Sequence, residues 1–565
     1  LGEDFSGNNL DFTTVALAST DQMLDTPTLN YCTLSPIDKY SGVTLSDGNL
    51  VATAGGGWYH GRGTLFAPSG KWYYEWIPTA GSYALAGWML NVSGNDYVEE
   101  ESDVATTFYR GVGAAGHGFV IGSGSTDSSV TNFALDDVIM MAIDVDSMKM
   151  WVGINGTWYN SGDPAGDSNP VGTWTDAIGQ SVAPWYGLYT STSETFNFGQ
   201  RPFAHTIPTG FNSWNTANLP TPSITDGSAY FQPTLYTGTS SALEVDQSGN
   251  STFTPDLAWI KSRSGSSNQV WIDSVRGVSK QLYSNATAAE ATAADGLTSF
   301  DADGFTLGDD SGDYVNIASA NMVAWQWKAN GAGSSNTDGS VTSTVSANTT
   351  AGFSVVKYTP GTGAQTWGHG LGVAPKMVIV KEIGAAVNWQ VYHESSGAGG
   401  KLFLNTTAAY AADTGIWNNT APTSSLVSTG SGINTANPFI AYCFAEIPGY
   451  SSIGSYTGNG STDGPFVYTG FRPSFVLLKR TNAAQEWQMY DTQRDSFNVA
   501  NHKLEPNSSN AESILTSDNN LDFLSNGFKL RQANGGMNAS GAPYIYMAFA
   551  ENPFGGDGVA PATAR

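Results

Sequence analysis

One short apolar segment occurs three times in this chain. It runs from a proline to a lysine, as PDLAWIK (255–261), PKMVIVK (375–381) and PSFVLLK (473–479). Short apolar runs that are rich in β-branched or aromatic residues are typical of buried strands. A segment that recurs at long intervals indicates internal duplication. The C-terminal half of the chain is therefore predicted to hold three copies of one β domain.

Other residues recur at matched distances from each lysine. A second predicted strand ends the same number of residues after the lysine in every copy, and an asparagine follows at a similar distance. Each copy closes on an aromatic strand (322–328, 439–446 and 544–551). The matched positions are Lys261, Lys381 and Lys479; Asp273, His393 and Asp491; Asn285, Asn405 and Asn507. Agreement at several positions favours tandem antiparallel sandwiches over chance similarity.

The composition agrees with an all-β fold. Charged residues make up 13%, about half the usual share, while the chain has 66 glycines. Many short strands joined by tight turns need this mixture, whereas long amphipathic helices need more charged and leucine residues. The net charge of -26 argues against nucleic acid and anionic membranes as partners. No run of 18 apolar residues is present, so no membrane insertion is expected.

The N-terminal half has a different strand pattern. Residues 69–78 alternate polar and aromatic positions, and residues 136–159 read as three consecutive strands. The second turn of that segment is Asn155-Gly156, which is a strong hairpin signal between apolar runs. Residues 183–203 add two more strands. We expect a two-sheet sandwich here.

These segments carry a family resemblance. The order GKWYYEW, AGW, MMAIDVDSMKMWVGINGTWY, PWYGLY and FNFGQRPF resembles the SPRY domain. The resemblance implies a bent, concanavalin-like sandwich whose loops bind proteins or other ligands. SPRY domains are not known as enzymes, and the loops of this chain differ from those of the animal versions. No binding residue can be transferred from that family.

The layout of nearly the whole chain resembles large virion proteins of tailed bacteriophages. The segments that carry this likeness are SGNNLDFTT, YTGNGSTDGPFVYTGFRPSFVLLKR and NPFGGDGVAPATAR. The resemblance implies a tail-fibre, tail-tip or capsid-surface role and a place on the virion surface. It also implies other virion proteins as partners and a homo-oligomer, with a trimer favoured. Because the chain begins with Leu1, we expect either a processed product or a longer chain in which an upstream domain precedes residues 1–27.

The predicted organisation has one SPRY-like domain and three repeats. The boundaries are an N-terminal arm at 1–27, the SPRY-like sandwich at 28–222, repeats at 223–335, 336–450 and 451–554, and a C-terminal tail at 555–565. Residues 223–228 and 330–340 have the composition of flexible linkers. The sequence leaves open whether the repeats form a rod or a cluster.

Aromatic residues in predicted loops are the first candidates for ligand contact. Trp and Tyr rings stack on the apolar faces of sugars, and their polar tips bond hydroxyl groups. The candidates are Trp58, Tyr59 and His60 after a glycine triplet, Trp158 and Tyr159 after the Asn-Gly turn, and Trp367. The other interpretation is that these rings belong to sandwich cores. A host-surface polysaccharide is the ligand that the first interpretation implies.

A cluster of carboxylates is the candidate metal site. It comprises Asp301, Asp303, Asp309, Asp310 and Asp313. Oxygen ligands on a glycine-rich loop suit a structural Ca²⁺, although the spacing does not fit an EF-hand. The alternative is that these carboxylates cap turns beside a short strand. No cofactor is required by the sequence, and no paired histidine or cysteine motif for zinc is present.

The sequence favours a protein that is not an enzyme. A glycosidase needs two carboxylates across a sugar cleft, and the acidic run 97–103 reads instead as a solvated loop. Asp273 and Asp491 are each followed three residues later by an arginine, which predicts a local ion pair. We expect a host-contacting fibre. The alternatives are a capsid decoration or fibre-shaft protein, a polysaccharide depolymerase and a secreted lectin.

Overall fold

The computed structural model describes residues 29–81, 83–91, 104–110, 118–121, 125–127, 134–515 and 520–556. Within them, the helical segments are single 3-10 turns of three residues, and all other regular elements are β-strands. The all-β prediction is confirmed. In these residues no helix is long and apolar enough to cross a membrane. The N-terminal arm 1–27, the acidic run 97–103 and tail residues 557–565 lie outside the described residues.

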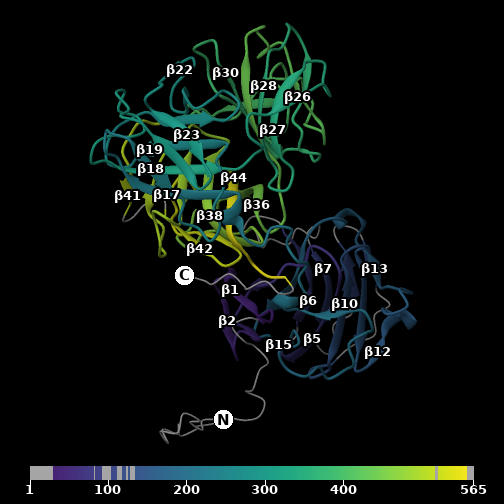
Figure 1. Cartoon of the computed structure of the whole chain (residues 1–565). Helices are drawn as coiled ribbons and strands as arrows, with labels where there is room; N and C mark the ends of the chain where they lie inside the picture. The colour runs from purple at the N-terminus through teal and green to yellow at the C-terminus, as the bar shows by residue number, and fades with distance from the viewer. Residues whose placement is uncertain are drawn as a thin grey trace, which may run out of the picture. The chain divides into compact units, whose positions relative to one another are not determined.

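The chain divides into two compact units, with the boundary between Pro220 and Thr221. The N-terminal unit contains two mainly antiparallel sheets (Figure 1). The first has the order β1 (Leu34–Lys39), β4 (Trp58–Gly63), β14 (Val182–Tyr189), β6 (Tyr83–Leu90), β7 (Val104–Arg110), β8 (Gly118–Ile121) and β9 (Ser125–Asp127). The second has the order β12 (Thr157–Trp158), β11 (Lys149–Ile154), β10 (Ile139–Asp144), β5 (Lys71–Ala80), β15 (Ser193–Asn197), β3 (Val51–Ala54) and β2 (Val43–Ser46). Two short strands join it, β13 (Gly172–Thr173) on β11 and β16 (Asn212–Ser213) on β5.

Local sequence explains the pairing in this sandwich. Asn155 and Gly156 both have positive φ, 45° and 89°, and β11 pairs with β12 across them, as predicted. Aromatic side chains fill the space between the sheets, with Tyr74 of β5 lying edge-on to Trp88 of β6 at 5.9 Å between ring centroids. The alternating aromatic pattern of residues 69–78 therefore corresponds to a strand that packs on the opposite sheet.

The C-terminal unit contains all three repeats. Repeat 1 has β17 (Phe231–Thr237), β18 (Leu243–Asp246), β19 (Leu257–Ser262), β20 (Val270–Asp273), β21 (Lys280–Tyr283), β22 (Ala291–Thr292), β23 (Leu297–Asp301), β24 (Gly304–Leu307) and β25 (Asn321–Trp327). Repeat 2 has β26 (Ser334–Asn336), β27 (Ser343–Asn348), β28 (Phe353–Tyr358), β29 (Gln365–Gly368), β30 (Met377–Glu382), β31 (Gln390–His393), β32 (Gly400–Phe403), β33 (Ala411–Ala412), β34 (Leu426–Thr429) and β35 (Phe439–Phe444). Repeat 3 has β36 (Ser451–Thr457), β37 (Phe466–Tyr468), β38 (Phe471–Arg480), β39 (Gln488–Asp491), β40 (His502–Lys503), β41 (Ser513–Ile514), β42 (Leu521–Leu524), β43 (Gly527–Leu530) and β44 (Pro543–Pro553).

The three repeats share one strand order. In each main sheet the closing aromatic strand (β25, β35 or β44) lies between one early strand of the repeat (β17, β28 or β36) and the proline-to-lysine strand (β19, β30 or β38). A small second sheet covers the other face, built around β18 and β24, β29 and β34, or β37 and β43. The register of the two central strands also repeats, because Leu257, Met377 and Phe475 lie opposite Trp327, Phe444 and Phe549.

These three repeats bury a common core. Trp327, Phe444 and Phe549 stand at the same position of the three closing strands and belong to one buried cluster. Their ring centroids are 6.1 Å apart for Trp327–Phe444, 5.7 Å for Trp327–Phe549 and 6.0 Å for Phe444–Phe549. We call these residues the aromatic triangle. The repeats are therefore arranged around an approximate threefold axis and form a single compact unit.

Equivalent backbone hydrogen bonds close the arrangement into a ring. Glu290 N donates to Ile383 O at 2.9 Å, which joins repeat 1 to repeat 2. Tyr410 N donates to Thr481 O at 2.8 Å, which joins repeat 2 to repeat 3. The third bond, from Glu512 N to Arg263 O at 3.0 Å, joins repeat 3 back to repeat 1. The repeats are thus a cluster, and the duplication does not lengthen the molecule.

The two segments with linker composition are bonded into this ring. Asp226 accepts the backbone N–H of Ser228 at 3.0 Å and caps the turn Gly227–Ala229. Within residues 330–340, β26 pairs with β27. Their glycine and serine content does not make them flexible spacers, because their backbone groups have partners in neighbouring strands and turns.

We predict that the aromatic triangle makes the three repeats unfold together. Trp327→Ala should lower the free energy of unfolding by about 3 to 5 kcal/mol, as for other buried aromatic residues. Amide hydrogen exchange should then speed up in peptides from all three repeats. Val245→Ala is the control, because Val245 lies in a separate cluster that belongs to repeat 1. Faster exchange confined to repeat 1 in the Trp327 variant would contradict a shared core.

Candidate functional site

Three loops of the N-terminal unit meet at one end of its sandwich. They connect β1 to β2, β3 to β4 and β14 to β15. Ala54 N donates to Thr192 O at 3.0 Å, and Thr190 N donates to Gly57 O at 3.4 Å. These backbone bonds hold the loop of the glycine triplet against the loop that follows β14.

Aromatic side chains crowd this end of the sandwich. Trp58 lies opposite Tyr189 in the β4–β14 pair, and their ring centroids are 4.6 Å apart. Tyr59 points to the other face of β4 and stacks on Tyr40 at 5.0 Å. Trp58 is 40% exposed and Tyr40 is 46% exposed. We call Tyr40, Trp58, Tyr59 and Tyr189 the loop-end aromatic cluster.

Glycine allows the close approach of these loops. A Cβ atom at Gly42 would lie 2.5 Å from Cζ of Tyr59, which is closer than real side chains come. Gly57 has a φ of 90°, a conformation that other residues rarely adopt. The glycine triplet thus turns the chain so that Trp58 and Tyr59 begin β4. The sequence analysis identified these two residues and missed Tyr40 and Tyr189. Tyr189 is brought beside Trp58 by the pairing of β14 with β4, and Tyr40 is brought against Tyr59 by the loop after β1.

The other predicted ligand residues are less accessible. His60 is buried and stacks on Trp185 at 5.3 Å between centroids, and burial lowers its pKa to about 4. Trp367 is fully buried against Tyr358, with centroids 4.7 Å apart, so it is a core residue and not a loop ligand. Trp158 is half-buried and lies edge-on to Tyr73 at 6.4 Å. Tyr159 begins a 3-10 turn and is half-buried.

The five aspartates do not form one calcium site. The buried carboxylate of Asp310 accepts the backbone N–H groups of Tyr314, Val315 and Asn316 at 2.7 to 2.8 Å. Asp301 accepts the hydroxyl of Thr306 at 2.7 Å. The remaining three, Asp303, Asp309 and Asp313, are exposed. In the part of the chain that the structure describes, no group of three or more His, Cys, Asp or Glu could hold a metal ion.

The repeated asparagines and lysines hold backbone groups in place. Asn285, Asn405 and Asn507 each accept one backbone N–H at 2.9 Å, from Gln269, Trp389 and Trp487. Lys261, Lys381 and Lys479 each donate to backbone carbonyls through Nζ. Burial lowers the pKa of all three ammonium groups to about 8. These positions recur because they support the same loops in each repeat.

The matched Asp and His positions lie at the junctions of the ring. Asp273 pairs with Arg276 at 2.5 Å and accepts the hydroxyl of Tyr442 in repeat 2 at 2.8 Å. Asp491 pairs with Arg494 at 2.5 Å and accepts the indole N–H of Trp325 in repeat 1 at 3.0 Å. The predicted Asp–Arg ion pairs are therefore present, and each carboxylate also bonds another repeat.

At the remaining junction a histidine takes the place of the carboxylate. His393 Nε2 lies 3.2 Å from Tyr546 O of repeat 3, and its Nδ1 accepts Ser395 N–H at 3.2 Å. Burial lowers the pKa of His393 to about 4, so the ring is neutral at pH 7 and its Nε2 carries the proton. Asp273, Asp491 and His393 are all buried within junctions, where a substrate has no access.

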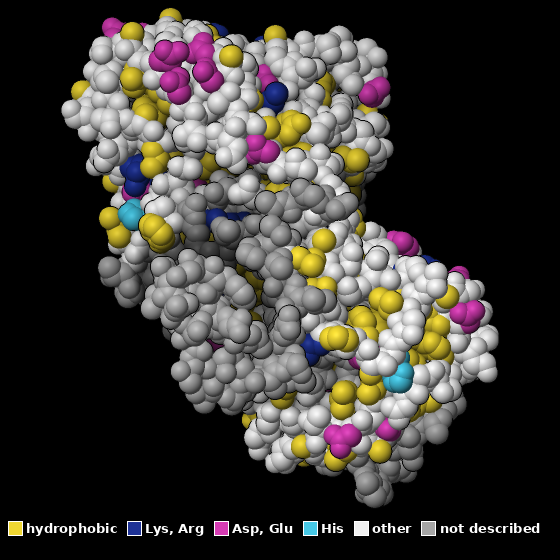
Figure 2. Space-filling view, turned by 60° about the horizontal axis from the view of Figure 1, so that its bottom comes forward, with side chains coloured by type: hydrophobic (Ala, Val, Ile, Leu, Met, Phe, Trp, Pro, Cys, Tyr) yellow, Lys and Arg dark blue, Asp and Glu magenta, His cyan; other side chains and the backbone are white. Residues whose placement is uncertain are grey.

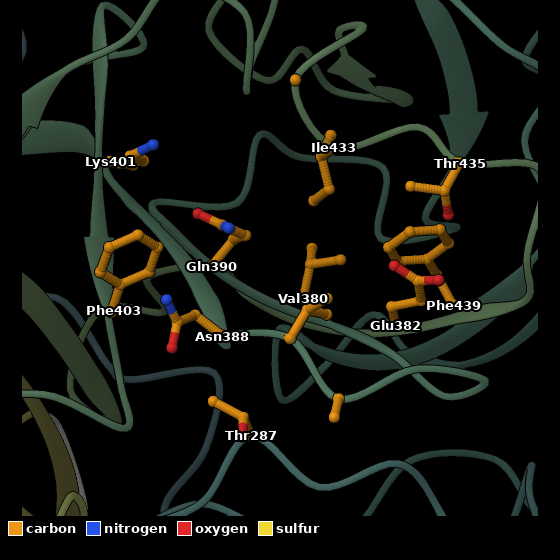
Figure 3. Close-up of a pocket in the computed structure, with 13 residues that line it drawn as sticks. Thr287, Val380, Glu382, Asn388, Gln390, Lys401, Phe403, Ile433, Thr435 and Phe439 are labelled. Atoms are coloured by element: carbon orange, nitrogen blue, oxygen red, sulfur yellow. The ribbon is translucent and has the colours of Figure 1, made fainter.

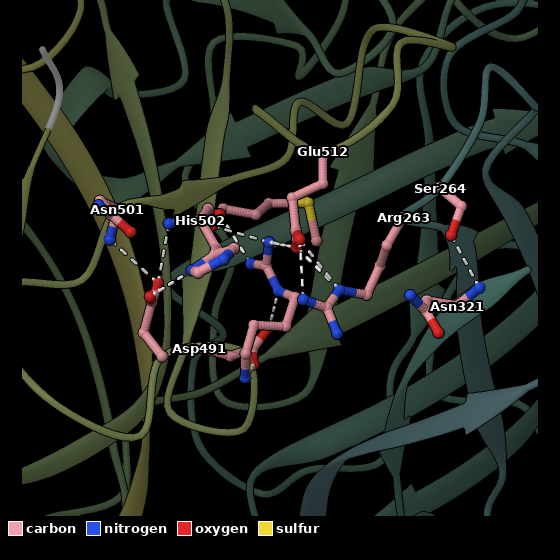
Figure 4. A network of polar contacts seen from close by, with 10 residues as sticks. Arg263, Ser264, Asn321, Asp491, Asn501, His502 and Glu512 are labelled. Atoms are coloured by element: carbon pink, nitrogen blue, oxygen red, sulfur yellow. Dashed lines mark hydrogen bonds and ion pairs between the residues drawn. The ribbon is translucent and has the colours of Figure 1, made fainter. Parts of the chain in front are cut away.

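An ion cluster strengthens the junction between repeats 3 and 1 (Figure 4). Glu512 bonds Arg263 at 2.8 Å and Arg494 at 3.1 Å. Burial alone would raise the pKa of Glu512, but the two guanidinium groups outweigh it and hold the pKa below its usual 4.5. The equivalent pair between Arg276 and Glu290 is longer, at 3.4 Å. Alternating charges of this kind form a clamp between repeats.

A family model described as "Domain of unknown function (DUF7483)" matches residues 226–553. The chain belongs to this family. The matched region runs through all three repeats of the ring. No curated protein matches the chain.

Solved structures of two SPRY domains and of one toxin are similar to part of this chain. The TRIM65 PSpry domain has 11% identity and a TM-score of 0.23, over 30% of this chain and 90% of that chain. The SPRY domain of human HERC1 has 14% identity and a TM-score of 0.21, over 30% of this chain and 99% of that chain. Stonustoxin has 14% identity and a TM-score of 0.24, over 30% of this chain and 27% of that chain. The two-sheet architecture itself rests on the strand pairings described above.

We predict that the Glu512 clamp stabilises the protein in a pH-dependent way. Glu512→Gln should lower the free energy of unfolding at pH 7 by about 2 to 3 kcal/mol, because two buried guanidinium groups lose a shared carboxylate. The folded-state pKa of Glu512 is depressed, so this contribution is present above pH 4.5 and is lost as the pH falls through the folded pKa. Denaturant unfolding at a series of pH values measures both effects.

The matched control for this prediction is Glu290→Gln. Glu290 occupies the same position in repeat 1, but its closest ion pair is longer and its side chain is more exposed. The loss should therefore be smaller. Equal losses for the two variants, or a Glu512 effect that does not change with pH, would contradict the clamp.

Proposed function

We propose that this chain is a non-enzymatic surface protein of a bacteriophage particle, a tail or surface fibre that contacts glycans of the host cell. The observation that carries the proposal is the loop-end aromatic cluster. It presents two exposed rings, Trp58 at the start of β4 and Tyr40 in the loop after β1, and Tyr40 N donates to His60 O of β4 at 2.8 Å. Exposed aromatic faces on a rigid loop end suit stacking on sugar rings.

The net charge of the chain favours a binding partner other than nucleic acid or an anionic membrane. The net charge is -26, which disfavours binding to nucleic acid and to anionic lipid. On the face drawn in Figure 2, acidic side chains occur at several separate places with few basic side chains beside them. The attribution to a phage particle rests on the sequence resemblance. Weak contacts would be multiplied by the number of copies on the particle.

The proposal assigns no catalytic step to the chain. The Asp and His residues that recur among the repeats are committed to ion pairs and hydrogen bonds at ring junctions. A polysaccharide depolymerase would need two accessible carboxylates facing one sugar cleft. Release of reducing ends from a host polysaccharide is the observation that would favour that alternative.

We predict that Trp58 supports binding to bacterial cells. Labelled full-length protein should bind cells of a susceptible host, and periodate oxidation of surface glycans should abolish the binding. Trp58→Ala should weaken binding about five- to tenfold, because a stacking ring contributes about 1 to 1.5 kcal/mol. Phe497→Ala is the matched control, since Phe497 is a 79% exposed aromatic residue of the other unit.

Three results would contradict this proposal. Binding that survives periodate, or equal binding by the Trp58 and Phe497 variants, would exclude a glycan contact at the loop end. Absence of binding to any cell, together with stable binding to purified capsid or tail proteins, would favour a capsid decoration or fibre-shaft protein.

We further predict that the chain assembles as a homo-trimer, as the phage resemblance implies. The ring forms all three of its junctions within one chain, so trimer contacts must come from surfaces outside those junctions. Light scattering after size-exclusion chromatography should give the mass of three chains. The mass of one chain would show that the internal ring replaces a three-chain assembly.

A further inference from the structure

The three junctions of the ring are equivalent in position, but the hydrogen bonds at one of them differ from those at the other two. Each repeat has a loop two residues beyond its matched asparagine, at Thr287, Thr407 and Ser509. At the junction of repeats 2 and 3, the carbonyl of Thr407 accepts two bonds from repeat 3. Lys479 Nζ donates at 2.8 Å and Gln485 N donates at 2.9 Å.

The junction of repeats 3 and 1 has the same two bonds. The carbonyl of Ser509 accepts Lys261 Nζ at 3.1 Å and Ser267 N at 3.0 Å. The donors are again the matched lysine and the backbone six residues after it, as in repeat 3. Two of the three junctions are therefore closed by the same pair of hydrogen bonds.

At the junction of repeats 1 and 2, both donors turn to other acceptors. Lys381 Nζ donates to Glu382 O at 2.8 Å and to Ala385 O at 2.9 Å. The backbone N–H of Val387 donates to Ala385 O at 3.1 Å. Lys381 and Val387 thus bond within repeat 2, and the loop that carries Thr287 is held instead by the indole of Trp389, which donates to Ala286 O at 3.2 Å.

A pocket occupies the space beside this open junction (Figure 3). Its volume is about 380 Å³, within the range of small-ligand sites. Figure 3 shows Asn388 and Gln390 on one side of the pocket, and Glu382 and Phe439 on the other. Thr287 of repeat 1 also lines it, so both repeats contribute to one site.

The polar groups of the pocket have unused bonding capacity. Gln390 Oε1 is buried and has no hydrogen-bond partner among the described residues. Buried acceptors normally have a partner, so this oxygen can accept one more donor. Glu382 uses Oε1 to accept Asn437 Nδ2 at 2.6 Å, and a carboxylate oxygen can accept further bonds. The site is rich in acceptors.

The charges and the apolar surface of the pocket further restrict the chemical class of ligand that it can bind. Lys401 is paired with Asp413 at 2.7 Å and lies over the ring of Phe403 at 5.4 Å, so its charge is already balanced. Glu382 is the carboxylate that lines the pocket, and a carboxylate disfavours a bound anion. Carboxylate and amide groups beside the rings of Phe403 and Phe439 suit hydroxyl groups on a partly apolar ring.

We propose that this pocket, the open-junction pocket, binds a neutral saccharide whose hydroxyls donate to Gln390 and Glu382. The proposal concerns a different unit from the loop-end aromatic cluster and does not rest on the proposed function. It explains why one junction of an otherwise repeated ring lacks the two closing bonds. A neutral sugar satisfies the buried acceptor and covers the phenyl rings in one binding event.

Saturation-transfer NMR on the full chain tests the proposal. The neutral probes are glucose, galactose, mannose, N-acetylglucosamine and lactose. Glucuronic acid is the negatively charged probe for comparison. Thr287→Trp should abolish or weaken binding about tenfold or more, because an indole at this exposed position fills the mouth of the pocket. Thr407→Trp is the matched control, since it makes the same change in the equivalent loop at a closed junction.

A second variant tests the chemistry without blocking the pocket. Gln390→Leu keeps the side-chain volume and removes the unpaired acceptor, and should weaken sugar binding several-fold. Thermal unfolding of each variant identifies any that fails to fold. Three results would overturn the proposal: no neutral probe binds the wild-type chain, glucuronic acid binds better than every neutral probe, or Thr287→Trp and Thr407→Trp have equal effects.

Discussion

The contact among Trp327, Phe444 and Phe549 is the constraint on which the C-terminal unit depends. Each ring comes from the closing strand of a different repeat, and each meets the other two within about the same distance. A single repeat would leave its ring exposed to water, so no repeat completes its core alone. Burying three large aromatic side chains at one axis brings the three sheets together and sets the geometry of every junction.

The junctions then show how polar groups adapt to a fixed core. Asp273 and Asp491 reach across to Tyr442 and Trp325, while His393 reaches a backbone carbonyl of repeat 3. The donor differs at each junction because the duplicated sequences have diverged. The constant feature is that each of these three side chains bonds a residue of another repeat, since an unpaired buried polar group is costly. At the junction of repeats 1 and 2, Gln390 Oε1 is one of the buried side-chain atoms without a partner among the described residues, and Gln390 lines the pocket.

The candidate sites show where reasoning from the sequence reaches its limit. The glycine triplet indicated that Trp58 and Tyr59 follow a turn, and they do. His60 and Trp367 have similar neighbours in the sequence but are buried against Trp185 and Tyr358. Exposure is decided by residues that pack from distant strands, and a local pattern does not carry that information. Residues 97–103 lie outside the described part of the chain.

The sequence by itself determined the repeat unit and its local bonds. Equal patterns of apolar residues produce equal strands, and an Asp–Arg spacing of three residues suffices for the pairs at Asp273 and Asp491. Only the tertiary structure decided that the three repeats close into a ring and that one junction opens into a pocket. Both depend on contacts between residues far apart in the chain, such as Glu512 with Arg263, whose pairing no local pattern encodes.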